Sequence, residues 1–86
     1  MNVVYIIESE TISKWYIGYS TNLDARLEDH NSNRSKWTRF KGQGPWQLIF
    51  KREFDTKSEA LKFEKQLKKI KNKRYICDRF REYFIE

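Results

Sequence analysis

Long hydrophobic runs and cysteine pairs are both missing from this sequence. No apolar stretch approaches the roughly 20 residues that a membrane-spanning helix needs, and the chain does not open with a basic segment followed by a cleavable apolar stretch. The single cysteine, Cys77, has no second cysteine with which to form an internal disulfide or a cysteine-based zinc site. These absences predict a cytoplasmic protein without a disulfide framework, and we assign Cys77 no catalytic role.

Sequence repeats, low-complexity segments and long linkers are also missing. A chain of 86 residues is long enough for one compact domain with one hydrophobic core. Aromatic residues make up 16% of the chain, and such bulky rings fill a small core efficiently. We therefore predict a single folded domain over residues 1–86.

Three segments rich in β-branched and aromatic residues predict β-strands. Val3–Ile7 and Lys14–Tyr19 are joined by a short polar loop, which is typical of a β-hairpin. Gln47–Glu53 follows a loop that contains glycine and proline, and it predicts a third strand. With the helices described next, these strands predict an α+β fold in which helices flank a small three-stranded antiparallel sheet.

Three further segments predict helices. Thr21–Asp24 has the Ser/Thr-x-x-acid pattern of a helix start, and this first helix should run to about His30. Residues 72–86 carry large apolar side chains at helix-compatible intervals and predict a C-terminal helix that folds back on the sheet. Between them, Thr56–Glu59 repeats the capping pattern before a longer helix, whose core face should carry Ala60, Leu61, Phe63, Leu67 and Ile70.

Positive charge dominates the sequence, with a formal net charge of +6 at pH 7. Such an excess attracts polyanions, although the plainer alternative is that it keeps the protein in solution. The segment Asn31–Trp46 favours nucleic acid, because it interleaves aromatic rings with cations and contains no acidic residue. Its cations are Arg34, Lys36, Arg39 and Lys41.

Two features break the helical patterns. Glu64 falls within the arc of the long helix that should face the core, where a carboxylate is costly unless it is paired or binds a cation. The plain alternative is a surface ion pair with Lys68, one turn further on. Arg26 and His30 lie on one face of the first helix, where a guanidinium suits a phosphate and an imidazole can move a proton. A solvated helix flank is again the simpler interpretation.

An ordered set of motifs resembles the GIY-YIG nuclease family, and most closely its short standalone bacterial branch. The similarity covers residues 3 to about 71. Val3 and Val4 depart from the glycine and isoleucine in the family name, although the tyrosine of that triplet stands at Tyr5. The motifs are Val3-Val4-Tyr5, Tyr16-Ile17-Gly18, Asn22-Leu23-x-x-Arg26-Leu27-x-x-His30-Asn31, Ser35-Lys36-Trp37-Thr38, Gly42-Gln43-Gly44-Pro45 and Ser58-Glu59-Ala60-Leu61-x-x-Glu64-x-x-Leu67-Lys68.

This resemblance implies a role for each matching residue. Glu64 would bind a magnesium or manganese ion, since Mg²⁺ is commonly held by one or two carboxylates plus substrate phosphate. Arg26 would clamp the scissile phosphate and stabilise developing charge. Tyr5 would act as the base that deprotonates water, with Tyr16 as an orienting partner and His30 as an auxiliary proton acceptor. Without the resemblance, both tyrosines would be interpreted as packing residues of the hairpin, and Gly18 is expected to have a structural role.

The resemblance therefore implies a metal-dependent endonuclease that hydrolyses phosphodiester bonds, in DNA more readily than in RNA. Lys36, Arg39 and Lys41 would hold the substrate backbone. The first alternative is a nonenzymatic nucleic-acid-binding module that kept the fold and the basic surface. A second is an interaction domain that meets a protein partner through exposed aromatic residues. Endonuclease activity requires Glu64 and a divalent metal, whereas simple binding is indifferent to both and weakens steeply with salt.

Overall fold

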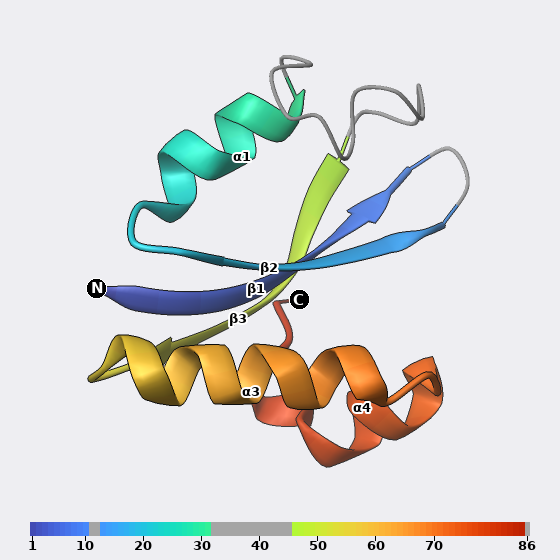
Figure 1. The fold of residues 1–86 in the computed structure, drawn as a ribbon. Coiled ribbons are helices and arrows are strands. Elements are labelled where there is room, and N and C mark those ends of the chain that lie inside the picture. The colour runs from blue at the N-terminus through green and yellow to red at the C-terminus, as the bar shows by residue number, and fades with distance from the viewer. Residues whose placement is uncertain (11–12, 32–45, 86) are drawn as a thin grey trace.

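The computed structural model describes residues 1–10, 13–31 and 46–85, except for the side chains of residues 29–31. Its centre is a three-stranded antiparallel sheet with the strand order β2-β1-β3. The central strand β1 covers Asn2–Ser9, β2 covers Trp15–Ser20, and β3 covers Trp46–Phe54. The predicted hairpin and third strand are thus confirmed, as is the α+β fold with helices on both sides of the sheet (Figure 1).

Helices cover both faces of the sheet (Figure 1). On one face, α1 (Leu23–Asn31) packs Leu23 and Leu27 against a small cluster of Tyr5, Ile7 and Trp46. On the other face lie α3 (Lys57–Lys69) and α4 (Lys73–Arg79), which close the main core. The buried residues of that core are Val4, Ile6, Phe50, Ala60, Phe63, Leu67, Ile76 and Phe80.

Burial on both faces explains the sequence of β1. Residues 3–7 are all buried, and because side chains alternate along a strand, Tyr5 and Ile7 face α1 whereas Val4 and Ile6 face α3. A strand covered on both faces is expected to be a continuous apolar run rather than an alternating one. This arrangement places Tyr5 at the centre of the sheet, with no exposed surface.

A β-bulge in β3 switches which of its residues face each helix layer. Ile6 pairs with Phe50 while the next residue, Ile7, pairs with Leu48, so Ile49 is the extra residue. Leu48 accordingly packs in the cluster under α1, whereas Phe50 is buried in the core under α3. Strict alternation along β3 would have put both residues on the same face.

The helix starts show which side chains satisfy the free backbone amides. Thr56 caps α3 as predicted, because its Oγ1 accepts a hydrogen bond of 3.2 Å from the backbone N–H of Glu59. The capping prediction for α1 was wrong by one residue. Asn22, rather than Thr21, caps that helix, since its Oδ1 accepts from the backbone N–H of Ala25 at 3.2 Å.

Within α3 the predicted core face is confirmed except at one position. Ala60, Phe63 and Leu67 are buried and Ile70 is partly buried against the core. Leu61 is 39% exposed and was assigned wrongly. It lies at the edge of the apolar stripe, and the helix turns that edge away from the sheet toward solvent.

The C-terminal segment folds back on the sheet as predicted, but its helix is shorter than residues 72–86. It ends at Arg79, and a 3-10 turn η1 follows at Arg81–Tyr83. The chain then runs beside β3, where Phe84 forms an isolated bridge with Phe50 and the Ile85 N–H donates to the Ile49 carbonyl at 2.9 Å. These contacts with the sheet replace the hydrogen bonds of a longer helix. None of the helices in the described ranges has the length and apolar content that crossing a bilayer requires.

Candidate active site

Tyr5 and Gly18 are direct partners in the β1–β2 ladder. A Cβ atom on Gly18 would lie 2.6 Å from both Cζ and Oη of Tyr5, and 3.0 Å from Cε1 of Tyr16. The phenol of Tyr5 therefore lies across β2 at a position where only glycine leaves room. A structural role was predicted for Gly18 through close backbone approach or a bulge. The role is structural, but its cause is the side chain of Tyr5, which crosses the strand at this position.

Tyr16 and Arg26 complete a cluster with Tyr5 on the α1 face of the sheet. The rings of Tyr5 and Tyr16 have centroids 6.4 Å apart and are tilted by 41°. Arg26 reaches them from α1, and its guanidinium interacts with both phenols through charge and hydrogen bonding. Tyr16 and Gly18 are two residues apart and so lie on one face of β2. Because the phenol of Tyr5 lies over Gly18, it reaches Tyr16 on that face.

The electrostatics of this cluster keep Tyr5 neutral and Arg26 charged. Burial, with a further contribution from Tyr16, raises the pKa of Tyr5 to about 12, although Arg26 acts in the opposite direction. For Arg26, burial lowers the pKa, but the neighbouring Tyr5 and Tyr16 outweigh it and leave the pKa raised. At neutral pH the site therefore presents a cationic fork beside a protonated phenol.

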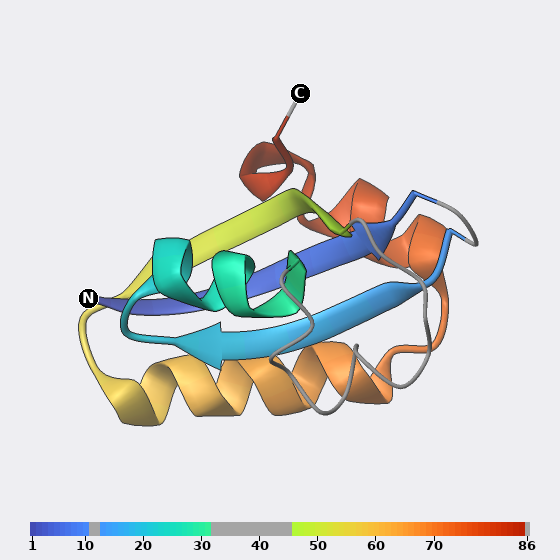
Figure 2. The ribbon, with the colours of Figure 1, turned by 90° about the horizontal axis from the view of Figure 1, so that it is seen from above.

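Glu64 lies on α3, close to the edge of the sheet formed by β2. Figure 2 shows α3 running beside β2 when the molecule is seen from above. The charge of Glu64 acts on Tyr5 and contributes to the raised pKa of that phenol, so the carboxylate lies within electrostatic reach of the tyrosine. Its side chain is 17% exposed, and Oε1 lies 3.7 Å from Nζ of Lys68. The ion pair with Lys68 considered from the sequence is therefore present.

The donor set at Glu64 limits how a metal ion would bind. In the described part of the chain, no group of three or more histidine, cysteine, aspartate or glutamate side chains is placed to hold a metal ion. One carboxylate still fits a magnesium or manganese ion, because Mg²⁺ retains several waters and takes further ligands from substrate phosphate. Glu64 is the residue that would supply this protein ligand.

The structure unites four of the residues selected from the sequence and leaves four others undescribed. Tyr5, Tyr16 and Arg26 are in mutual contact, and Glu64 acts on Tyr5 from α3. The backbone of His30 belongs to α1, but its side chain lies outside the described part of the structure. All cations of the basic segment also lie outside the described residues, including the three assigned to the substrate backbone, Lys36, Arg39 and Lys41.

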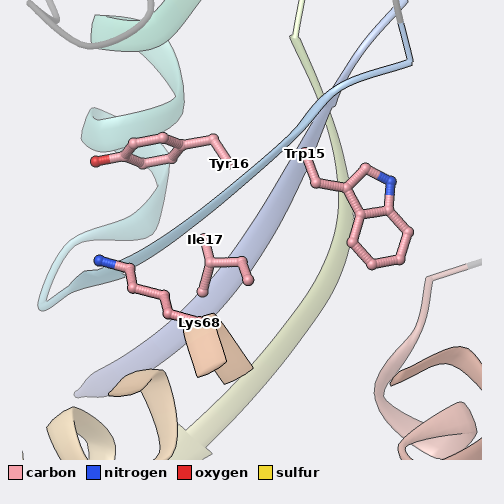
Figure 3. Close-up of a pocket in the computed structure, with 4 residues that line it drawn as sticks. All are labelled: Trp15, Tyr16, Ile17 and Lys68. Atoms are coloured by element: carbon pink, nitrogen blue, oxygen red, sulfur yellow. The ribbon is translucent and has the colours of Figure 1, made fainter. Parts of the chain in front are cut away.

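A pocket beside Tyr16 was not predicted. It has a volume of about 420 Å³ and is lined by Trp15, Tyr16, Ile17 and Lys68 (Figure 3). From the sequence, Lys68 was considered only as an ion-pair partner of Glu64. The sequence signal that could have linked Lys68 to the site is its spacing of four residues from Glu64, because residues at i and i+4 lie on one face of a helix.

Comparison with known proteins gives consistent matches over most of the chain. The sequence model of the GIY-YIG catalytic domain matches residues 1–76. The UPF0213 protein BH0048 of Halalkalibacterium halodurans is 38% identical over 72 residues, which cover 83% of this chain and 73% of that protein. The UPF0213 protein YazA of Bacillus subtilis is 35% identical over 83 residues, covering 95% of this chain and 75% of the relative.

A third relative matches a similar share of this chain, and one relative has a solved structure. The UPF0213 protein VNG_2274C of Halobacterium salinarum is 37% identical over 71 residues, covering 81% of this chain and 88% of its own. The solution NMR structure of the UPF0213 protein BH0048 from Bacillus halodurans matches with a TM-score of 0.51 at 38% identity. That match covers 86% of this chain and 77% of the other, and it supports the three-stranded α+β fold.

Proposed function

Because this chain belongs to the GIY-YIG catalytic domain family, we propose that it is a divalent-metal-dependent endonuclease that hydrolyses phosphodiester bonds in nucleic acid, with DNA as the favoured substrate. The observation that carries the proposal is the contact of Arg26 with both motif tyrosines, within reach of the Glu64 charge. Packing alone would not require a charged guanidinium between two phenols. The planar donors of a guanidinium also suit a phosphate.

Arg26 binds the scissile phosphate in this proposal. Its guanidinium stays protonated throughout the pH range of interest, and its planar donors match two phosphate oxygens at once. When water attacks phosphorus, negative charge grows on those oxygens, and fixed donors in a partly buried site stabilise it. Tyr16 keeps the guanidinium oriented through its phenol oxygen.

Tyr5 accepts the proton of the attacking water. Tyr5 first releases its own phenol proton to solvent. One P–O bond then forms as the water proton passes to the phenolate of Tyr5, the bond to the leaving oxygen breaks, and that oxygen takes a proton from solvent. Burial opposes that phenolate, while Arg26 favours it. A divalent cation bound at Glu64 would supply positive charge that further favours the phenolate and polarises the phosphate. His30, on α1 one turn after Arg26, is assigned as an auxiliary proton acceptor.

The substrate backbone is assigned to the basic segment that follows α1 in the chain. Lys36, Arg39 and Lys41 carry positive charge without an acidic neighbour between residues 31 and 46. Contacts of this kind hold the phosphates of either nucleic acid, and they supply affinity rather than sequence readout. Cleavage is therefore expected at many sites on a long duplex.

The test is cleavage of labelled single-stranded, duplex and branched DNA and RNA with magnesium or manganese. Wild type is compared with Glu64→Ala and Arg26→Ala, and circular dichroism checks that all three proteins are folded. We expect cleavage by wild type alone, with nucleic-acid binding retained by both variants. Equal cleavage by wild type and Glu64→Ala would contradict the proposal.

The raised pKa of Tyr5 favours one alternative, a nucleic-acid-binding module without turnover. A phenol with a pKa of about 12 is almost entirely protonated at neutral pH, so little phenolate is present to accept a proton. The net charge of +6 supports binding in either case. If none of the substrates is cut, yet wild type and both variants bind with the same salt dependence, this second function replaces the first.

A further inference from the structure

Lys68 lies between the carboxylate of Glu64 and the pocket beside Tyr16. Its Nζ is 3.7 Å from Oε1 of Glu64, while 54% of its side chain remains exposed. It also lines the pocket of about 420 Å³ with Trp15, Tyr16 and Ile17. In Figure 3 the ammonium of Lys68 and the hydroxyl of Tyr16 extend in the same direction, on the two sides of β2. The lysine thus connects the outer edge of the sheet with the candidate catalytic carboxylate.

The flank of α3 that carries Glu64 is basic. By helical periodicity, Lys57 and Lys68 lie on that flank, and both are exposed; Lys65 lies further round, on the outer face of the helix, and is exposed too. Lys65 also lines a second depression of about 390 Å³ with Ser58, Leu61, Lys62 and Glu64. An anionic chain that approaches Glu64 from this side therefore meets lysines first.

We propose that Lys68 is a substrate-binding residue that holds a backbone phosphate next to the one that is cut, while the pocket beside Tyr16 receives the sugar and base of that nucleotide. The chemistry of the lining fits such an occupant. An ammonium pairs with phosphate as a point charge, and an aromatic side chain such as Tyr16 gives a base an apolar surface on which to stack. That the neighbouring phosphate is cut rests on the proposed function, but the contact of Lys68 with a phosphate requires no turnover.

The ion pair with Glu64 is compatible with this exchange. A pair at 3.7 Å whose lysine is half exposed gains little free energy in water, so Lys68 can leave Glu64 at small cost when a phosphate is present. Its departure would leave Oε1 of Glu64 available to a cation. The lysine thus neutralises Glu64 in the free protein and the substrate in the complex.

The experiment measures binding of a fluorescently labelled single-stranded DNA oligonucleotide by anisotropy, in EDTA and over a series of salt concentrations. The full chain is compared with Lys68→Gln, Lys68→Arg and the control Lys69→Gln. Lys69 is the next residue of α3, is also exposed, and lines neither of the two pockets named above. Thermal denaturation confirms that each variant is folded.

Loss of one phosphate contact should lower the salt slope by about 0.7 for a single strand, which corresponds to about fivefold weaker binding near 0.1 M salt. We expect this change for Lys68→Gln, less than half of it for Lys69→Gln, and wild-type behaviour for Lys68→Arg. Equal slopes for Lys68→Gln and Lys69→Gln would overturn the inference. So would an absence of measurable binding by wild type.

A double variant separates substrate binding from a role limited to holding Glu64. Glu64→Gln releases Lys68, so it should tighten binding in EDTA by more in the wild-type background than in the Lys68→Gln background. An equal gain in both backgrounds means that Lys68 does not take the phosphate, which overturns the inference.

The binding readout also keeps this inference distinct from the proposed function. If wild type cuts no substrate but Lys68→Gln has a lower salt slope of binding, the phosphate contact is supported and the nuclease proposal is rejected. If wild type cuts but Lys68→Gln and Lys69→Gln bind indistinguishably, the nuclease proposal is supported and the inferred phosphate contact of Lys68 is rejected.

Discussion

Tyr5 and Gly18 face each other across the β1–β2 ladder, and the phenol of Tyr5 fills the space that a side chain at position 18 would need. The tyrosine of Val3-Val4-Tyr5 thereby explains the glycine of Tyr16-Ile17-Gly18. A glycine in the interior of a strand normally weakens it. Here the same glycine allows a fully buried tyrosine to reach over the neighbouring strand toward Arg26 and Glu64.

The first prediction concerns this contact. Gly18→Ala should destabilise the fold by about 1–3 kcal/mol, because the new Cβ overlaps Tyr5 in a packed interior. Urea denaturation measures the free energy of unfolding. The cost should shrink when Tyr5 is replaced by leucine in the same chain, and an unchanged cost in that background would show that the overlap is not its cause.

The second prediction concerns the hydroxyl of Tyr5. Tyr5→Phe keeps the ring but removes the oxygen that interacts with Arg26, so cleavage should fall by about 10²- to 10⁴-fold while the fold is retained. Tyr19→Phe is the matched control, since it removes a part-buried hydroxyl that donates to Asn2 Oδ1 at 2.8 Å, outside the cluster. Single-turnover cleavage by both variants decides the matter, and a similar loss in each would count against a catalytic role for Tyr5.

A third prediction follows from the pKa of Tyr5. Its pKa is raised from 10.0 to about 12 on folding, so the folded state holds the phenol proton more tightly than the unfolded state. The resulting stabilisation is fully present below pH 10 and is lost as the pH rises toward 12. Compared with Tyr5→Phe, wild type should lose more stability across this window in urea titrations. Parallel curves of stability against pH for the two proteins would show that burial does not shift the pKa of Tyr5.

The fourth prediction separates charge from geometry at Arg26. Arg26→Lys keeps the positive charge but loses the planar fork that serves two phenols and a phosphate, so cleavage should drop by about 100-fold or more. Nucleic-acid binding should change little, because the charge remains. Arg74→Lys, at an exposed position of α4, is the control and should cleave like wild type. Near-normal cleavage by Arg26→Lys would mean that charge alone is required.

Local patterns were sufficient to predict most elements of the fold. Capping residues, helical spacing and β-branched runs predicted the three strands to within two residues, and the starts of α3 and α1 to within one. The bulge at Ile49 and the end of α4 at Arg79 were not predictable in this way. Both depend on contacts with distant residues, such as the bridge between Phe50 and Phe84, which outweigh local preference.

The candidate site was predictable in part for the same reason. Tyr16 and Gly18 share a face of β2 by simple alternation, and the hairpin register brings Tyr5 to them. The reach of Glu64 to Tyr5 depends on where α3 docks against the sheet, which no local pattern encodes. The pocket that Lys68 lines has the same origin.

The central position of β1 has a kinetic consequence. Its neighbour β2 follows after a short turn, whereas β3 begins only at Trp46 and must close a much longer loop. Tyr5, Tyr16 and Arg26 all belong to the early, local part of this topology. Glu64 joins them when β3 and α3 have docked, so we expect refolding to assemble the phenol–guanidinium cluster before the carboxylate arrives.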